Sequence, residues 1–239
     1  YVHLTLLPYL NASGEMKTKP TQQSVGKLRE IGIQPDALVC RCEKPMDDSM
    51  RRKISLFCNV RPEAVIQEID VPTTIYEVPL DLQRHGLDQA IAEHLNLPSS
   101  QIDMSDWENL VHQWANPEQN IEIGIIGKYI ELHDAYKSIY EALSHAGTAN
   151  KTKVHFRKIS AESLCEKDPS AMLEGVSGIL VPGGFGERGL EGKISAIKWA
   201  RENNVPTFGI CLGMQAITIE FARHVAGIKD ANTSEVNKE

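Results

Sequence analysis

The chain has 239 residues, 41% of them hydrophobic, which is enough to fill one large or two small cores. Its formal net charge of −7, with no long basic run, argues against a nucleic-acid partner. The longest apolar runs have the length of strands, so the sequence predicts no transmembrane span, no signal peptide and no membrane partner.

The first part of the chain, residues 1–97, alternates strand-like and helical stretches in the manner of an α/β domain. It opens on Tyr1 without an initiator Met, at what reads as the middle of a strand, and the chain ends at Glu239 among polar residues. We therefore expect the sequence to be an internal piece of a longer polypeptide. The predicted strands are residues 2–7, 37–40 and 54–57, and the predicted helices include residues 24–31 and 87–95.

A short basic stretch follows the first predicted strand. It reads Lys17-Thr18-Lys19-Pro20-Thr21-Gln22 and offers two ammonium groups, two hydroxyls and an amide around a stiffening proline. Such a set neutralises and hydrogen-bonds a polyphosphate, while the amide reads the edge of a base. Taken alone, the stretch is more typical of a solvated basic loop, so its composition does not establish a nucleotide site.

Residues 98–120 are predicted to link two domains. The sequence turns polar after Pro98, and an amphipathic helix then carries apolar residues at i, i+3, i+4 and i+7, namely Trp107, Leu110, Val111 and Trp114. We interpret the tryptophans as packing this helix onto one domain rather than as a partner site. Residues 116–120, rich in Asn, Gln and Pro, close the linker.

From residue 121 the pattern is strongly βαβ. The predicted order is a strand at 121–126, a helix from Asp134 to Gly147, strands at 154–159 and 178–181, a helix at 190–202 and a strand that ends beside Cys211. This succession predicts half of a doubly wound, flavodoxin-like parallel sheet, incomplete in this chain. Its functional corner should lie at the carboxyl ends of the strands.

Cys211 stands at a strand-to-helix corner in the sequence Gly209-Ile210-Cys211-Leu212-Gly213-Met214-Gln215. The two flanking glycines let two backbones approach where side chains would collide. The positive end of the helix stabilises a thiolate there, and the spacing parallels the G-x-S-x-G nucleophile elbow. A core cysteine on a buried strand is the competing interpretation, which this motif alone does not exclude. The other cysteines, Cys40, Cys42, Cys58 and Cys165, have neither disulfide-framework nor zinc-ligand spacing, which suits a reducing cytoplasm.

A glycine-rich loop follows the strand at 178–181. Because parallel strands joined by a helix bring their carboxyl ends to one edge of the sheet, we expect Gly183-Gly184 to lie beside Cys211. Amide N–H groups of the loop and of Leu212 would then converge on one oxygen as an oxyanion hole. The G-x-G-x-x-G at 184–189 lacks the acidic residue that a dinucleotide site needs at the next strand. The pair Gly192-Lys193 lacks the glycine and the Ser or Thr of a P-loop.

The corner and the loop together closely resemble the class I glutamine amidotransferases, which hydrolyse glutamine through a cysteine thioester and release ammonia. Further motifs along the chain are Lys17-Thr18-Lys19-Pro20-Thr21-Gln22, Gly127-Lys128-Tyr129-Ile130-Glu131-Leu132 with Asp134-Ala135-Tyr136-Lys137-Ser138, Pro182-Gly183-Gly184-Phe185-Gly186, Ala200-Arg201-Glu202-Asn203-Asn204 and Ile210-Cys211-Leu212-Gly213-Met214-Gln215. Through these motifs the whole chain resembles the CTP synthase family. Their joint occurrence in this order is highly specific.

This resemblance implies a ligase that forms a C–N bond with glutamine as amido donor. Ammonia from the glutaminase domain would travel through the protein to the synthetase domain, where UTP, phosphorylated at O4 by ATP with Mg²⁺, is aminated to CTP. The resemblance further implies GTP as an allosteric activator and a cytoplasmic homotetramer with UTP sites at the subunit interfaces. The pathway would be pyrimidine biosynthesis.

The resemblance also implies roles for individual residues. Cys211 matches the nucleophile, and a carboxylate at Glu235 suits the ammonium group of the substrate. The glutamine-binding positions are Gly184, Leu212, Gly213, Met214, Gln215 and Glu235. The UTP- and CTP-binding positions are Lys17, Thr18, Lys19, Pro20, Thr21, Gln22 and Lys53, and the ATP-contacting positions are Ile69, Asp70 and Val71.

Parts of the family pattern have no counterpart in the sequence. The phosphate-binding loop and magnesium carboxylates are expected upstream of Tyr1, and the catalytic His and Glu downstream of Glu239. The domains would be the C-terminal part of the synthetase domain at 1–97, the linker at 98–120 and the N-terminal half of the amidotransferase domain at 121–239. Two alternatives stay open: another class I amidotransferase or glutamine hydrolase whose front part is unrelated to UTP, and a catalytically silent piece that serves assembly.

Overall fold

The computed structural model describes residues 1–98 and 102–237, so residues 99–101 of the predicted linker lie outside the described part. It divides into two compact units, Tyr1–Ala115 and Asn116–Glu239. Both are α/β and both contain a parallel sheet, which confirms the predicted fold class. Within the described ranges, no helix combines the length and apolar character needed to cross a membrane.

The sheet of the first unit has three parallel strands in the order β1-β4-β5. They are β1 (Val2–Leu7), β4 (Ala37–Cys42) and β5 (Val65–Ile69), with Val2 opposite Ala37 and Leu38 opposite Val65. A small antiparallel pair, β2 (Tyr9–Leu10) and β3 (Glu15–Met16), follows β1. The predicted strand at 2–7 is confirmed, and the one at 37–40 is confirmed with two further residues.

Five helices accompany this sheet among the described residues: α1 (Lys19–Glu30), α2 (Asp48–Cys58), α3 (Val78–Arg84), α4 (Leu87–His94) and α5 (Ser105–Ala115). Short 3₁₀ turns at Pro62–Ala64 and Ile75–Glu77 precede β5 and α3. The buried core lies on one face of the sheet, where Leu38 and Cys40 of β4 pack with Val25, Ile54 and Ala90 from three helices. Alternation along β4 sends Val39 and Arg41 to the opposite face.

The predicted strand at 54–57 is wrong, because these residues belong to α2. Asp47 caps that helix by accepting a hydrogen bond from the Met50 amide at 2.7 Å. Ile54 and Cys58, four residues apart, are buried on one helical face. A four-residue apolar run does not distinguish a strand from a buried helix segment, and the capping signal at Asp47 decides it.

Helix α5 carries the tryptophans of the predicted linker and packs within the first unit. The Trp107 Nε1 atom donates to the Tyr76 carbonyl oxygen at 2.6 Å. The Tyr76 ring also lies against Trp107 and Trp114, with centroid distances of 6.2 and 5.3 Å. The two tryptophans therefore pack against the first unit, as their interpretation required, while the extent of the linker stays a prediction.

The described residues of the second unit form a sheet of four parallel strands in the order β7-β6-β8-β9. They are β6 (Gln119–Gly127), β7 (Thr152–Ser160), β8 (Gly178–Val181) and β9 (Thr207–Gly209). In chain order this is 2-1-3-4, which matches the first four strands of the flavodoxin-like order. The strand order reverses between β6 and β8, so the carboxyl ends of these strands border the crevice where such sheets bind ligands.

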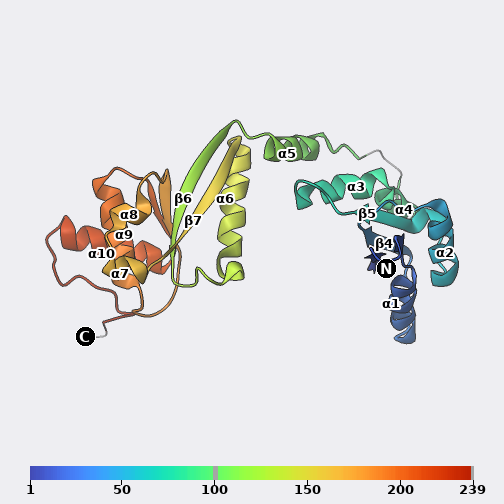
Figure 1. Ribbon diagram of the computed structural model, residues 1–239, viewed down its shortest axis with the longest axis horizontal. Coiled ribbons are helices and arrows are strands. Elements are labelled where there is room, and N and C mark those ends of the chain that lie inside the picture. Colours follow the sequence, from blue (N-terminus) through green and yellow to red (C-terminus); the bar gives the residue numbers. More distant parts are fainter. Residues whose placement is uncertain (99–101, 238–239) are drawn as a thin grey trace. The chain divides into compact units, whose positions relative to one another are not determined.

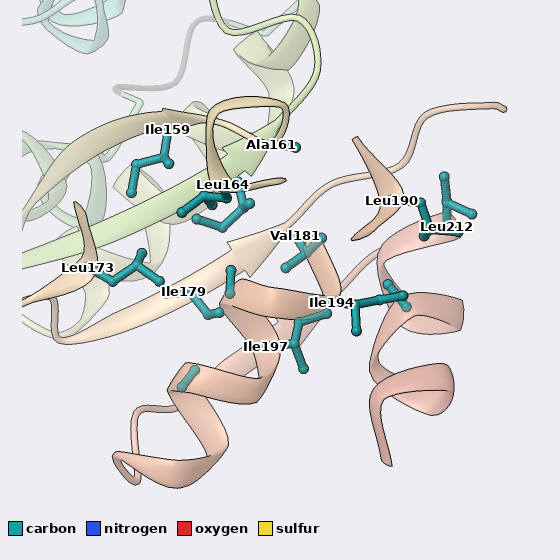
Figure 2. Close-up of a cluster of buried hydrophobic side chains, with 14 of the residues drawn as sticks. Ile159, Ala161, Leu164, Leu173, Ile179, Val181, Leu190, Ile194, Ile197 and Leu212 are labelled. Atoms are coloured by element: carbon teal, nitrogen blue, oxygen red, sulfur yellow. The ribbon is translucent and has the colours of Figure 1, made fainter. Parts of the chain in front are cut away.

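Helices cover both faces of this sheet (Figure 1). Helix α6 (Lys137–Ala149), after a 3₁₀ turn at His133–Tyr136, packs on β7 and on one face. The other face is covered by α7 (Ser163–Glu166), α8 (Pro169–Leu173), α9 (Leu190–Glu202) and α10 (Leu212–His224). Figure 2 shows the resulting core, in which Ile179 and Val181 of β8 face Ile194 and Ile197 of α9.

Candidate active site

Cys211 occupies a sharp corner between β9 and α10. Its backbone has φ 53° and ψ −114°, and it is the residue that immediately precedes the helix. A positive φ at a residue with a side chain is strained, and such residues persist only where the surrounding structure enforces them. The corner therefore has the geometry expected of a nucleophile elbow, with the thiol exposed at the end of the strand.

Two glycines make this corner possible. A Cβ on Gly213 would lie 1.9 Å from the Val181 carbonyl oxygen, and one on Gly209 would lie 2.5 Å from Gly213. Neither distance is compatible with a side chain. The glycines on both sides of Cys211 thus allow the close backbone approach that the spacing predicts.

The glycine-rich loop after β8 lies directly beside the cysteine. A Cβ placed on Gly183 would lie 3.3 Å from the Cys211 Cβ and 3.8 Å from its Sγ. The amide N–H of Leu212 is the first of helix α10 and has no acceptor one turn earlier within the helix. The structure therefore brings together the loop, the thiol and a free helix N-terminus, which is the arrangement an oxyanion hole requires.

Among the described residues, no hydrogen bond reaches the Cys211 sulfur. The described histidine side chains of the second unit are engaged elsewhere: His145 pairs with Glu141, His155 bonds Asn120, and His224 bonds Glu220 at the far end of α10. The site as described thus holds a nucleophile and candidate oxyanion donors. A general base for the thiol is not among these three histidines.

The remaining cysteines are chemically different. Burial raises the pKa of Cys40 and of Cys42 to about 11, and burial also raises the pKa of Cys58. A thiol that resists ionisation is a poor nucleophile. Cys165 is exposed, and its Sγ donates to the Ala161 carbonyl oxygen. Cys211 is the described cysteine that combines exposure with a strained helix-start position.

The predicted glutamine-binding residues lie around this corner. The Gln215 Nε2 atom donates to Glu235 Oε1 at 2.9 Å, and the Thr233 hydroxyl donates to the other side of the same amide. Met214 is exposed at the start of α10, whereas Leu212 is fully buried and offers only its main chain. The contacts of these residues with glutamine stay predictions, but Gln215 and Glu235 do form one hydrogen-bonded group.

Two lysines beneath the loop were not predicted as site residues. Lys193 is fully buried, and its Nζ donates to the Pro182 carbonyl oxygen at 2.9 Å. The Lys128 Nζ donates to the Phe185 and Gly186 carbonyl oxygens at 2.7 and 2.6 Å. A signal for Lys193 was present in the helical spacing, since it precedes the buried positions 196, 197 and 200 by three, four and seven residues.

In the first unit, the basic stretch lies at the start of α1. Thr18 is the residue before the helix and Pro20 stands in its first turn. The Lys17 Nζ donates to Glu15, and this bond, with a smaller contribution from Lys53, lowers the pKa of that carboxyl. Lys17 and Lys19 therefore stand at a helix N-terminus, which is a position that suits an anion.

Within the stretch, the hydroxyl groups face inward. Thr21 is fully buried and donates to the Leu6 carbonyl oxygen at 3.1 Å, while Gln22 Nε2 donates to the Thr18 hydroxyl at 3.2 Å. Their side chains brace the start of the helix, and direct contact with a nucleotide stays a prediction for both. Lys19 is exposed and points its charge outward from the first turn.

The predicted ATP-contacting turn divides between two environments. Asp70 and Val71 line an open pocket of about 660 Å³ with Arg41, whose Nε donates to Asp70 Oδ1 at 2.7 Å. Ile69 packs toward the buried core instead. Glu68 also lines the pocket. Burial raises its pKa, and its Oε1 has no hydrogen-bond partner among the described residues. The sequence reasoning missed Arg41 and Glu68.

Comparison with known proteins matches both units. A family model described as CTP synthase N-terminus covers residues 1–97, and one described as glutamine amidotransferase class-I covers residues 131–239. The CTP synthase of Oleidesulfovibrio alaskensis is 55% identical over 239 residues, 100% of this chain and 43% of that protein. Those of Caldanaerobacter subterraneus and Nitratidesulfovibrio vulgaris are each 54% identical, over 98% and 100% of this chain and 44% and 43% of theirs.

The chain therefore spans less than half of the length of these curated relatives. A solved structure, the CTPS glutaminase domain of Trypanosoma brucei with bound acivicin, has 40% sequence identity and a TM-score of 0.46. That match covers 50% of this chain and 47% of the other.

Proposed function

Because the chain belongs to the CTP synthase family, we propose that its second unit releases ammonia from glutamine and that its first unit serves the amination of UTP to CTP. The observation that carries the proposal is Cys211, held at φ 53° with its sulfur 3.8 Å from where a Gly183 side chain would begin. The membership and the match of residues 1–97 favour this reading over a stand-alone glutamine hydrolase.

The first chemical step follows from the geometry of the corner. The Cys211 thiolate attacks the side-chain amide carbon of glutamine, a C–S bond forms, and the carbonyl π pair moves onto oxygen. That charge is met by the loop and Leu212 amides. The pair then returns, the C–N bond breaks, and the leaving nitrogen takes up a proton and departs as ammonia. Water cleaves the thioester, so that glutamine and water give glutamate and ammonia.

The proposed substrate, glutamine, has two polar groups that complement residues of this unit. Its carbonyl oxygen meets the amides at the helix start, and its α-ammonium group suits the carboxylate of Glu235, which is already placed by Gln215. Held by the helix-start amides at one end and by Glu235 at the other, glutamine would be oriented before the thiolate attacks.

For the first unit, the exposed lysines at the start of α1 are proposed to meet the triphosphate of UTP or CTP, and the pocket at Asp70 and Val71 to meet ATP. Mg²⁺ with ATP follows from the resemblance alone. In the described part of the chain, no group of three or more His, Cys, Asp and Glu side chains is arranged to hold a metal ion, and we derive no step through one. GTP activation, a tetrameric assembly and a cytoplasmic location likewise belong to the proposal.

The test is labelling by a glutamine-analogue diazo-ketone, which alkylates a cysteine that attacks as it attacks glutamine. The protein carrying this sequence should take up one equivalent, at Cys211. Cys165→Ala is the matched control, since this thiol is also exposed, and the variant should label normally. Label that survives Cys211→Ala, or that spreads over Cys40 and Cys58, would refute the assignment.

A further inference from the structure

The loop beside Cys211 contains a pair of glycines, Gly183 and Gly184, whose backbone conformation is costly to fix. Gly184 has φ 153°, a region that residues with side chains rarely adopt, and Gly183 precedes it directly. Glycine loses more conformational freedom on ordering than any other residue. An oxyanion hole, however, acts only if its amides are fixed before the charge develops. Something outside the pair must therefore hold this loop.

The structure shows a tether on each side of the pair. Before it, Lys193 of α9 donates to the Pro182 carbonyl oxygen at 2.9 Å. After it, Lys128, at the end of β6, donates to the Phe185 and Gly186 carbonyl oxygens. The peptide bonds of the loop are trans, so each carbonyl oxygen points opposite to the next amide N–H. The hydrogen bond from Lys193 to the Pro182 carbonyl oxygen therefore fixes the Gly183 N–H in the opposite direction.

Both lysines approach the same point of the loop. A Cβ on Gly184 would lie 3.6 Å from Lys128 Cδ and 3.9 Å from Lys193 Nζ. Placing two ammonium groups so near each other costs stability. Burial, with the charge of Lys128, lowers the pKa of Lys193 to about 8, and burial with the charge of Arg188 lowers the pKa of Lys128. An apolar pair would fill this space without that cost.

Lys128 is itself held by the main chain around it. The Tyr136 hydroxyl accepts hydrogen bonds from the Lys128 and Tyr129 amides at 3.1 and 3.3 Å. The Tyr136 ring lies where a Cβ on Gly127 would clash, at 2.6 Å. The ammonium group therefore extends from a fixed strand end, and Lys193 extends from a buried helix face. Each tether links the loop to a rigid element.

We propose that Lys193 and Lys128 are positioning residues, which clamp the glycine-rich loop by its carbonyl oxygens and so hold its amides in place for the oxyanion formed at Cys211. The inference rests on the proposed glutaminase function. The hydrogen bonds of both ammonium groups go to carbonyl oxygens of the loop and not to the Cys211 sulfur, so in this role each lysine acts through the main chain.

The experiment measures glutamine hydrolysis in the protein carrying this sequence and in its Lys128→Met and Lys193→Met variants. Loss of one oxyanion donor typically lowers kcat by roughly 100- to 1000-fold, so a misplaced one should lower it by about 10- to 100-fold, with KM for glutamine changed little. Alkylation of Cys211 by iodoacetamide forms no oxyanion, so in Lys128→Met its rate should stay within about twofold. Lys128→Arg, which keeps donors for two carbonyls, should restore most of kcat.

Lys198→Met is the matched control, because it removes an ammonium group from the same helix as Lys193 without touching the loop, and its kcat should be unchanged. Amide hydrogen exchange of residues 183–187 gives a readout independent of turnover and should quicken in both clamp variants. Unchanged kcat in Lys128→Met and Lys193→Met would overturn the inference. An equal loss of kcat and iodoacetamide reactivity in Lys128→Met would overturn it too, since that indicates a general packing defect.

Failure of the proposed function has a different signature. In that case the unmodified protein would neither hydrolyse glutamine nor take up the diazo-ketone at Cys211, and the clamp would lose its purpose with it. If the unmodified protein does both and the clamp variants match it, the clamp alone is refuted.

Discussion

In each unit the candidate site lies where a parallel strand leads toward the start of a helix. The two sites differ in whether backbone groups or side chains supply the functional atoms. At Cys211 the site is formed by the backbone: a strained residue, two glycines without room for a side chain, and carbonyl oxygens held by lysines. At the start of α1 the candidate groups are the ends of long, exposed side chains, with Lys17 paired to Glu15.

This difference separates a preorganised site from an adaptable one. A transition state needs fixed dipoles, because any reorganisation during the reaction adds to the barrier. A polyphosphate needs charge more than exact placement, and flexible ammonium groups can supply it on arrival. We therefore expect substitutions at the Cys211 corner to abolish activity or leave it intact. Substitutions at the start of α1 should weaken nucleotide binding by degrees, and the size of the effect should depend on salt concentration.

The largest effect should come from Gly213→Ala. The added methyl would lie 1.9 Å from the Val181 carbonyl oxygen, so the corner must open, and the free energy of unfolding should fall by about 3 kcal/mol, the upper end of the usual cost of overpacking. Gly26→Ala, in the middle of α1 with nothing within 4 Å, is the contrasting change and should stabilise by about 0.5–1 kcal/mol. Denaturant unfolding of both variants measures this, and a tolerated Gly213→Ala would show that the corner is not tightly packed.

The second effect concerns pH. Folding lowers the pKa of Lys193 from 10.5 to about 8, so between these values the unfolded chain binds more protons at this group than the folded chain. Its contribution to unfolding free energy must then rise with pH across that window, by at most about 1.4 kcal/mol per pH unit. Lys193→Met removes this contribution, so the stability of the variant relative to the unmodified protein should decline from pH 8 to 10.5. If the stability of Lys193→Met and of the unmodified protein changed in parallel with pH, the burial of this charge would be contradicted. The control variant Lys198→Met should show such a parallel pH dependence.

A third test probes the adaptable site. Lys19→Ala should weaken UTP and CTP binding by about 1.5–3 kcal/mol, the range for a hydrogen bond to a charged group, while glutamine hydrolysis without nucleotide stays intact. Lys27→Ala, on the same helix and paired with Glu30, is the control and should bind normally. Calorimetry at two salt concentrations measures both affinity and its salt dependence. Equal damage to both activities would point to folding rather than to a nucleotide contact.

The smallest effect tests packing in the first unit away from its charged groups. Trp107→Phe removes the Nε1 bond to the Tyr76 carbonyl oxygen and should cost about 1 kcal/mol of unfolding free energy. Trp114→Phe keeps a ring against Tyr76 and should cost less. If the two variants are equal in thermal unfolding, the hydrogen bond contributes nothing beyond the ring contacts.

Much of the fold was readable from the sequence because its strongest elements are long or bounded by glycine and proline. The strand at Gly178–Val181 and the helix at Leu190–Glu202 have the predicted bounds. The strand predicted at 54–57 was wrong because a run of four mostly apolar residues fits both the helical and the strand period. Strand β5 was missed because Gln67 and Glu68 interrupt its apolar pattern.

The candidate sites likewise contain residues that the sequence predicted and residues that it did not. The corner at Cys211 was predictable because only glycine satisfies its close contacts, and glycine spacing is visible in sequence. The clamp of Lys128 and Lys193 could not be predicted, because a lysine is normally expected to be solvated. Only the tertiary structure shows that Lys193 faces a carbonyl oxygen. Glu68 and Arg41 were missed for a related reason: their pocket lies on a sheet face, and no local motif marks it.

The contact between Gly213 and Val181 also has a consequence for when the thiol becomes reactive. The Val181 carbonyl oxygen that packs against Gly213 belongs to β8, which is distant from α10 in the chain, so a peptide spanning β9 and α10 alone lacks this contact at the corner. If Cys211 is the nucleophile, we expect it to react as an ordinary cysteine until β8 has docked. A reagent selective for this thiol would then label folded molecules and leave unfolded ones unlabelled.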